Sequence, residues 1–367
     1  MGVDGCYTGS RKHRGKMIIT YLRSSSYGSH EMCPMKYFLE YNLGWKGPSN
    51  IKAEKGTIVH KVLEILGEIK LQQQLGADTF EDDVVGTVDV SDYDVDDLIG
   101  KCYDYYVHYS IHKWKPIDRK HCFQWTYKAL EYRDGEFDPR NSEMVKAEQA
   151  FDFEVNKPWA MYEYELPNGD TVEGFLALKG TIDQISKIDD ETYQILDWKT
   201  GRRLNWATGE EKDYAALNKD PQLMLYYYAA QHLYPDIENI QIVIYFINDG
   251  GPFTICFSRS DIPKIENMLK EKFEDIKNSE MPALNKSWKC TKFCHYGTTT
   301  FEDTHIKPII ERREGEVTPK GQCMTKCEQT KYCLQNRSMN SVIKNMSAKG
   351  HDINKYDAPG EVKEETK

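Results

Sequence analysis

Apolar residues recur at helical spacing in several parts of the chain. After Lys55-Gly56 they predict an amphipathic helix whose apolar face is formed by Ile58, Val62, Ile65 and Leu66. Residues 262–277 predict a second amphipathic helix, and residues 99–130 predict a helical region rich in aromatic residues. Helices are therefore expected both early and late in the chain.

Polar residues mark the ends of two further helices. Asp220 is predicted to cap a helix that begins at Pro221, and Pro235 lies just past its end. Ser29 is predicted to cap an earlier helix, which carries Tyr37. These boundaries place a helix on either side of the central part of the chain.

Other segments have the pattern of strands. Strand-like runs begin near Met144 and continue at residues 172–178, 180–188 and 193–199. Residues 240–247 are apolar on both faces, as in a strand buried within a sheet. Residues 77–98 are acidic and predict a solvated insertion, with a mobile element that mimics or repels nucleic acid as the alternative.

Composition narrows the class of protein. The chain has 367 residues, of which 40% are hydrophobic, so it can bury a sizeable core. Its longest apolar run is far shorter than the roughly 20 residues of a membrane helix, and the basic residues 11–16 are not followed by a secretory apolar stretch. We therefore expect a soluble, cytoplasmic protein without a membrane partner, located in the host cytoplasm if its source is a virus. The net charge of −10 disfavours a nonspecific nucleic-acid binder but is compatible with a nuclease that has a local basic groove.

Residues 180–201 carry the clearest chemical signal. Two strand-like runs flank the polar turn Asp189-Asp190-Glu191, which predicts a β-hairpin. If the turn is centred on Asp190, residues pair symmetrically about it and Asp183 faces Asp197. Lys199 then shares a face with Asp197, because side chains alternate along a strand.

This arrangement of Asp183 and Asp197 suggests a metal site. Facing residues have Cβ atoms about 4.5–5.5 Å apart, and two carboxylates that close repel each other unless a cation lies between them. Mg²⁺ favours one or two carboxylates together with water and phosphate oxygens. Lys199 could position the attacking water and stabilise developing charge. The alternative is a solvent-facing hairpin with ordinary charges.

Several motifs together resemble those of one enzyme family. They are Cys33-Pro34-Met35-Lys36-Tyr37, Gly56-Thr57-Ile58-Val59-His60, Glu148 ahead of a strand over residues 151–155, Gly180-Thr181-Ile182-Asp183, Asp197-Trp198-Lys199-Thr200-Gly201, and Gln222-Leu223-Met224-Leu225-Tyr226. In this order they resemble the C-P-x-x-Y, G-x-x-x-H, acidic, G-x-I/V-D, D-x-K-T-G and Q-x-x-x-Y motifs of the PD-(D/E)XK nuclease superfamily, in its RecB-type exonuclease branch. CRISPR adaptation nucleases and helicase-linked nucleases belong to this branch.

The resemblance implies an α/β fold and an assignment of site residues. The fold would be a restriction-endonuclease-like core, with a central mixed sheet flanked by helices, a helical insertion and a Cys-rich C-terminal segment. The implied residues are His60, Asp183 and Asp197 for one or two Mg²⁺ or Mn²⁺ ions, Glu148 and Lys199 beside them for catalysis, and Gln222, Tyr226, Arg202 and Arg203 for substrate binding. Gln222 and Tyr226 share a helical face, from which they could contact the DNA backbone or order the carboxylates.

Composition along the chain, together with the resemblance, predicts a domain organisation. We expect a flexible basic arm over residues 1–17 and a nuclease core over 18–287, with a helical and acidic insertion at about 68–145. A Cys-rich metal-binding segment would follow over 288–340, and a flexible charged tail over 341–367.

Cysteine positions suggest a second metal site. Relatives in this branch often hold an iron–sulfur cluster with one thiolate before the core and three after it, and this layout favours Cys33, Cys290, Cys294 and Cys327 as ligands of a [4Fe-4S] cluster. The spacing departs from the family pattern, so Cys323 and Cys333 are rival ligands. A Zn²⁺ site that uses Cys290, Cys294 or His295 with downstream thiolates is the alternative metal site, and ordinary reduced cysteines are the alternative without metal.

The sequence thus predicts a metal-dependent deoxyribonuclease, specifically an exonuclease in DNA processing, recombination or repair. Its predicted partner is DNA, with single-stranded DNA as one candidate form. One alternative is a non-catalytic nucleic-acid-binding subunit that retains the nuclease fold. Another is a nuclease active only with a helicase or recombination partner, because the chain lacks a G-x-x-x-x-G-K-[ST] loop of its own.

Overall fold

Two compact units make up the part of the chain that is described. The computed structural model describes residues 17–44, 49–165, 171–205, 208–279, 282–292 and 294–298. One unit draws its described residues from 1–48, 153–178 and 269–367, and the other from 49–152 and 179–268. No helix among these residues is long and apolar enough to cross a membrane.

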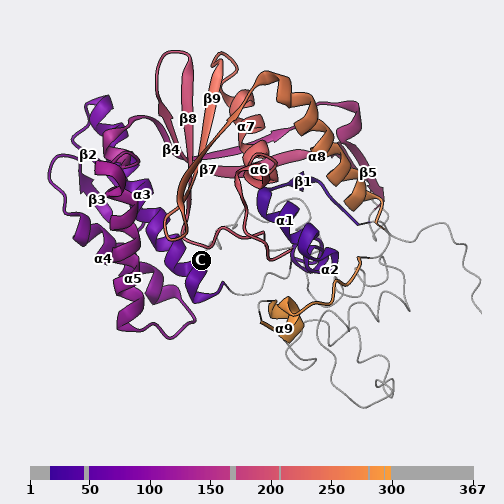
Figure 1. The fold of residues 1–367 in the computed structure, drawn as a ribbon, viewed down its shortest axis with the longest axis horizontal. Helices are drawn as coiled ribbons and strands as arrows, with labels where there is room; N and C mark the ends of the chain where they lie inside the picture. The colour runs from indigo at the N-terminus through magenta and orange to yellow at the C-terminus, as the bar shows by residue number, and fades with distance from the viewer. Residues whose placement is uncertain are drawn as a thin grey trace, which may run out of the picture. The chain divides into compact units, whose positions relative to one another are not determined.

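A mixed sheet lies at the centre of the second unit (Figure 1). Strand β7 pairs antiparallel with β8, β8 pairs parallel with β9, and β9 pairs antiparallel with β10, while β4 also pairs with β7. The strand bounds are β4 Glu143–Glu154, β7 Ala177–Lys187, β8 Thr192–Lys199, β9 Asn239–Phe246 and β10 Gly251–Phe257. Together with the flanking helices, this sheet confirms the predicted α/β core.

The hairpin of β7 and β8 has the predicted register. Gln184 pairs with Leu196 and Lys187 with Tyr193, so the pairs are symmetric about residue 190. The paired ladder ends at Gln184 and Leu196, one position before Asp183 and Asp197. The two aspartates therefore lie directly beyond the last paired residues.

Helix α3 (Ile51–Leu75) covers one side of this region and begins earlier than predicted. The Asn50 side chain caps it, because its oxygen accepts hydrogen bonds from two backbone N–H groups of the first turn. The predicted apolar face is buried as expected, at Ile58, Val62, Ile65 and Leu66. Burial of this face against the sheet and against α4 and α5 fixes the position of the helix.

The insertion contains a β-hairpin as well as helices. The predicted helical region forms two helices, α4 (Val95–Tyr109) and α5 (Pro116–Leu130). Within the acidic stretch, β2 (Thr79–Asp82) pairs with β3 (Gly86–Asp89). Val85, Val88 and Val90 are buried in the same core as α3. Most acidic side chains of this stretch are exposed, as predicted for a solvated insertion, but alternate apolar residues of the hairpin pack against the helices and order it.

The remaining elements of the second unit support the sheet. Helix α7 (Pro221–Leu233) begins as predicted, with the Asp220 carboxylate accepting the N–H of Gln222 at 2.9 Å. The others are α6 (Tyr214–Leu217), the 3₁₀ helices Tyr132–Asp134, Pro139–Asn141 and Arg259–Asp261, and the start of α8 (Ile262–Lys277).

The first unit collects short elements from distant parts of the chain. They are β1 (Tyr21–Leu22), α1 (Ser24–Met32), α2 (Pro34–Tyr37), a π-helix (Phe38–Asn42), a 3₁₀ helix (Pro158–Ala160), β5 (Met161–Glu165), β6 (Thr171–Phe175), the end of α8, α9 (Lys289–Lys292) and α10 (His295–Thr298). The prediction that Ser29 caps a helix was wrong. The helix begins at Ser24, because Ser26 exchanges two hydrogen bonds of 2.9 Å with the backbone of Arg23.

Candidate active site

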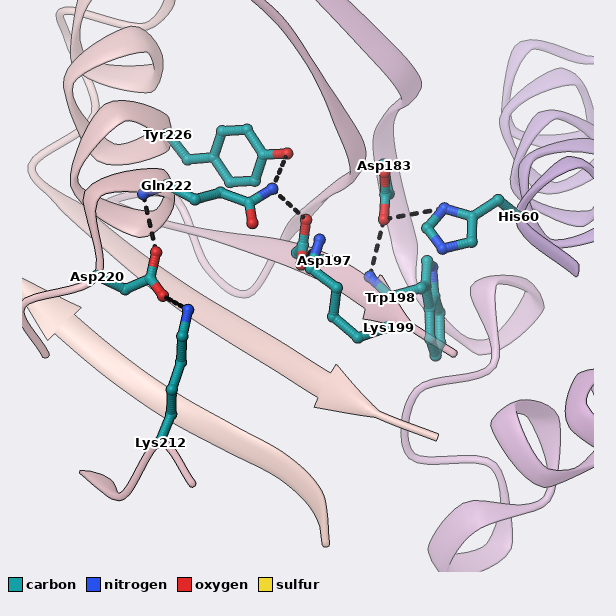
Figure 2. Close-up of polar contacts among 9 residues, drawn as sticks. All are labelled: His60, Asp183, Asp197, Trp198, Lys199, Lys212, Asp220, Gln222 and Tyr226. Carbon is teal, nitrogen blue, oxygen red and sulfur yellow. Dashed lines mark hydrogen bonds and ion pairs between the residues drawn. The ribbon is translucent and has the colours of Figure 1, made fainter. Parts of the chain in front are cut away.

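Asp183 and Asp197 lie together where β7 and β8 stop pairing (Figure 2). One carboxylate oxygen of Asp183 accepts the backbone N–H of Trp198 at 2.8 Å. The side chain of Asp183 thus takes the place of a strand–strand hydrogen bond, and this holds its carboxylate over β8 beside Asp197.

Asp197 is fully buried and paired with Lys199. The Lys199 ammonium lies 2.6 Å from its Oδ2 atom. Burial and the neighbouring negative charge of Asp183 raise the pKa of Asp197, although Lys199 opposes this. Burial acts on Asp183 in the same direction, but His60, Lys199 and the Trp198 N–H outweigh it and lower the pKa of Asp183. The two carboxyl groups are therefore held at different proton affinities, as in sites that perform acid–base or metal chemistry.

His60 approaches this pair from α3. Its Nδ1 atom lies 3.3 Å from Oδ2 of Asp183 (Figure 2). Burial lowers the pKa of His60, but the Asp183 carboxylate more than compensates, and the net pKa is raised. A Cβ atom on Gly56, one turn earlier, would lie 2.6 Å from Oγ1 of Thr200. The absence of a side chain at Gly56 therefore lets α3 come close to the end of β8 and carry His60 to the carboxylates.

Glu148 reaches the site from the interior of β4. The prediction placed it before a strand, but β4 begins at Glu143 and includes it. Its backbone has a φ of +49°, in the left-handed region that non-glycine residues rarely adopt. Glu148 keeps part of its surface in solvent, but partial loss of water around its carboxyl group and the charges of Asp183 and Glu64 raise its pKa to about 7. Its carboxyl group can therefore gain or lose a proton near neutral pH.

A cavity of about 420 Å³ opens in front of these groups. It is lined by Ala53, Gly56, Thr57, His60, Lys61, Glu64, Tyr106, Glu148, Trp198, Lys199, Thr200 and Gly201. Lys61, Glu64 and Tyr106 are lining residues that the sequence motifs did not indicate. Helical spacing from His60 could have indicated Glu64, four residues later, whereas no local signal pointed to Tyr106 in the insertion.

Gln222 and Tyr226 contact the carboxylates from α7. The Gln222 amide donates to Oδ1 of Asp197 at 3.3 Å and to the Tyr226 hydroxyl at 2.8 Å (Figure 2). Tyr226 is only 5% exposed. Of the two roles considered for this pair, these contacts favour ordering of the active-site carboxylates over direct contact with DNA.

The two arginines after β8 differ in their surroundings. Arg202 is exposed. The Arg203 guanidinium donates to the carbonyl of Lys212 at 2.8 Å, pairs with Glu211 and lies 4.7 Å from the centre of the Phe253 ring. Arg203 therefore organises its own loop in this structure, and Arg202 is better placed to meet a phosphate.

The donor atoms of this site suit a hard divalent cation. Within the residues that the structure describes, no three His, Cys, Asp or Glu side chains are grouped closely enough to hold a metal ion by themselves. Mg²⁺ does not require such a group, because one or two carboxylates with water and substrate phosphate complete its shell. Asp183 and Asp197, with His60 beside them, fit that requirement.

The predicted cysteine site is only partly within the described residues. Cys33 lies between α1 and α2, where its thiol is 3.9 Å from the carbonyl of Ala283, and Cys290 lies in α9. Cys294 precedes α10. Cys327 and its rivals Cys323 and Cys333 lie outside the described residues. The structure therefore gives the iron–sulfur prediction no support.

Comparison with known families agrees with the motifs. The profile of the PD-(D/E)XK nuclease superfamily matches residues 24–299, which include His60, Asp183, Asp197 and Lys199. The chain belongs to this superfamily. Membership of the PD-(D/E)XK superfamily confirms the predicted resemblance and identifies the protein as a nuclease.

A solved structure is similar to this PD-(D/E)XK chain. A crystal structure from Eubacterium rectale named "Putative exonuclease" is similar with 13% sequence identity and a TM-score of 0.39, over 76% of this chain and 89% of that one. No curated protein sequence matches the chain.

Proposed function

We propose that this PD-(D/E)XK protein is a divalent-metal-dependent deoxyribonuclease that degrades DNA as an exonuclease. The observation that supports this most is the group formed by the fully buried Asp197, the largely buried Asp183 and the partly exposed Lys199, at the point where β7 and β8 stop pairing. Two adjacent carboxylates, one fully buried and one largely buried, do not stabilise a fold, because each loses hydration and repels the other. A catalytic function explains why the two carboxylates lie together beside a cavity.

Asp183, Asp197 and His60 would hold the metal, with Glu148 close by. When bound, Mg²⁺ or Mn²⁺ would polarise the scissile phosphate and lower the pKa of a water molecule. Lys199 orients that water and offsets negative charge as the phosphorus–oxygen bond breaks. Glu148, with a pKa of about 7, can take up a proton released at neutral pH.

Gln222 is proposed to position Asp197 rather than to act on the substrate. Its amide donates to Asp197 and to Tyr226, so it holds one carboxylate oxygen in a fixed direction. Arg202, exposed beyond β8, is the proposed contact to a substrate phosphate.

A cleavage assay with variants tests the proposal. Purified protein is incubated with end-labelled single- and double-stranded DNA, with Mn²⁺ or with excess EDTA. We expect cleavage only with the metal, and its loss in Asp183→Asn, Asp197→Asn and Lys199→Ala. Cleavage in EDTA, or turnover by any of these variants at the wild-type rate, would contradict the mechanism.

Circular substrates separate the remaining possibilities. An exonuclease should degrade linear DNA and leave circular single-stranded DNA intact, whereas an endonuclease cuts both. Binding of DNA without any cleavage would favour the non-catalytic subunit, and cleavage only after addition of a helicase would favour the partner-dependent nuclease.

The four-thiolate site is a separate proposal. Protein purified without oxygen should contain iron and sulfide in comparable amounts if Cys33, Cys290, Cys294 and Cys327 hold a [4Fe-4S] cluster. A Ser substitution at Cys33 should remove the visible absorption, whereas the same change at the buried Cys102 should not. Stoichiometric zinc would replace the cluster, and the absence of both metals would dismiss the site.

A further inference from the structure

Three tyrosines of α4 form an aromatic surface beside the active-site cavity. Tyr105 and Tyr109 lie one turn apart with ring centroids at 5.1 Å, and Tyr105 lies 5.4 Å from Tyr106. Tyr109 is 70% exposed and Tyr105 is 36% exposed. We call these three residues the tyrosine rim.

The tyrosine rim is continuous with the cavity. Tyr106 lines the cavity together with His60 and Lys199. The loop that follows Tyr109 is joined to the start of α3, because the Ser110 hydroxyl donates to the Glu54 carboxylate at 2.5 Å and the His112 ring lies 2.6 Å from the Ser49 carbonyl. A strand of substrate that leaves the cavity on this side would therefore pass along the tyrosine rim.

Positive charge accompanies the exposed rings. Lys113, Lys115 and Lys120 are exposed just after the tyrosine rim, in a chain whose net charge is −10. Trp114 packs edge-on against Tyr103 at 5.3 Å and anchors the loop, so its two lysine neighbours face solvent. Exposed aromatic rings followed along the chain by cations suit a nucleic acid, because the rings can stack on bases and the ammonium groups can contact phosphates.

We propose that the tyrosine rim is a stacking platform for the unpaired bases of single-stranded DNA that enters the active site. A duplex covers the faces of its bases by internal stacking, so exposed tyrosine rings have no partner on it, whereas a single strand offers one face per nucleotide. This inference rests on the proposed nuclease function and specifies the substrate as single-stranded.

Binding measurements in EDTA test the platform without cleavage. Fluorescence anisotropy is measured with a labelled single strand, a duplex of the same sequence, and an abasic strand that has the same number of phosphates. Wild-type protein should bind the single strand on the order of tenfold more tightly than the abasic strand, since stacking of one base typically contributes a factor of this size or more.

The Tyr105→Ala/Tyr109→Ala variant should lose most of this difference, and Tyr105→Phe/Tyr109→Phe should keep it because the rings remain. Tyr214→Ala is the matched control, since Tyr214 is 55% exposed on α6 of the same unit. Lys113→Ala/Lys115→Ala should weaken binding of the normal and abasic strands equally and reduce the salt dependence of both.

Two results would overturn the platform. The first is that the double alanine variant binds the single strand with an affinity within twofold of wild type. The second is that wild type binds the duplex at least as tightly as the single strand and that the double alanine variant loses this duplex binding too. Hydrolysis of bis(p-nitrophenyl) phosphate with Mn²⁺ reports the active site alone, because this compound has no bases. Wild type and the double variant should hydrolyse it equally, and failure of both would reject the nuclease mechanism independently of the binding result.

Discussion

The Lys199–Asp197 ion pair combines a structural and a chemical role. Asp197 is fully buried, so removal of the Lys199 charge leaves an unpaired carboxylate in the interior. We expect Lys199→Met to abolish cleavage and to lower the free energy of unfolding by on the order of 3 kcal/mol. Chemical denaturation in EDTA measures the second effect.

The double variant Asp197→Asn/Lys199→Met separates the two roles. It removes both charges, so it should recover much of the lost stability while remaining inactive. Recovery of cleavage, or no recovery of stability, would show that the pair does not act as described.

Glu148 should make folding stability depend on pH. Its pKa is raised from 4.5 to about 7, so the folded protein retains a proton that the unfolded chain has already released in this range. Stability therefore falls as pH rises through this window. Thermal melts in EDTA should show Glu148→Gln more stable than wild type at pH 8 and equal to it at pH 4.

The same variant should cleave DNA poorly, because the amide cannot take up a proton. Glu154→Gln, at the exposed end of β4, provides the control. An identical stability difference between Glu148→Gln and wild type at both pH values would mean that the carboxyl group is not perturbed in the folded state.

Among the secondary-structure elements, β4 and β7 pack closely where Phe151 of β4 meets Gly180 of β7. A Cβ atom on Gly180 would lie 2.5 Å from the Phe151 ring, which is 4% exposed. We expect Gly180→Ala to destabilise the protein by about 1–3 kcal/mol through overpacking, as measured by denaturant titration. Gly201→Ala, where no atom lies within 4 Å of the added carbon, should have little effect on stability.

A smaller partner should relieve the strain at Gly180. The double variant Gly180→Ala/Phe151→Leu is expected to lose less free energy of unfolding than the sum of the losses in the two single variants. Strict additivity would indicate that the two side chains do not meet.

For the molecule as a whole, acid should be destabilising through His30 of the first unit. His30 is 5% exposed, and burial together with the charge of Lys272 lowers its pKa to about 4. In the unfolded chain His30 takes up a proton near pH 6.5, whereas in the folded protein it stays neutral until about pH 4. The free energy of unfolding therefore decreases as pH falls from 6.5 towards 4. The full effect is on the order of 3 kcal/mol.

Melting curves between pH 4 and 7 test this expectation. His30→Gln should flatten the pH dependence in this range, whereas the exposed His232 on α7 can be changed to Gln without this effect. A wild-type slope in His30→Gln would mean that other groups cause the acid sensitivity.

Local signals were sufficient for much of the fold and for part of the candidate site. The hairpin register followed from the position of one polar turn, because side chains alternate with a period of two and a short connection leaves little freedom. The start of α7 at Asp220 and Pro221 was equally local. Ser29 was wrongly predicted as a cap, because the nearer Ser26 bonds to the backbone of Arg23 and starts the helix. The β-hairpin inside the acidic insertion was not predicted, because it depends on packing of Val85, Val88 and Val90 against the helices.

The sequence by itself determined the family, the α/β core and the pairing that brings Asp183 next to Asp197, since these depend on short-range patterns and on motifs in a set order. Only the tertiary structure decided how closely α3 approaches Thr200, that Glu148 projects from a left-handed position inside β4, and that Tyr106 of the insertion borders the cavity. These features join residues distant in sequence, and their positions result from the packing of whole elements rather than from any local preference.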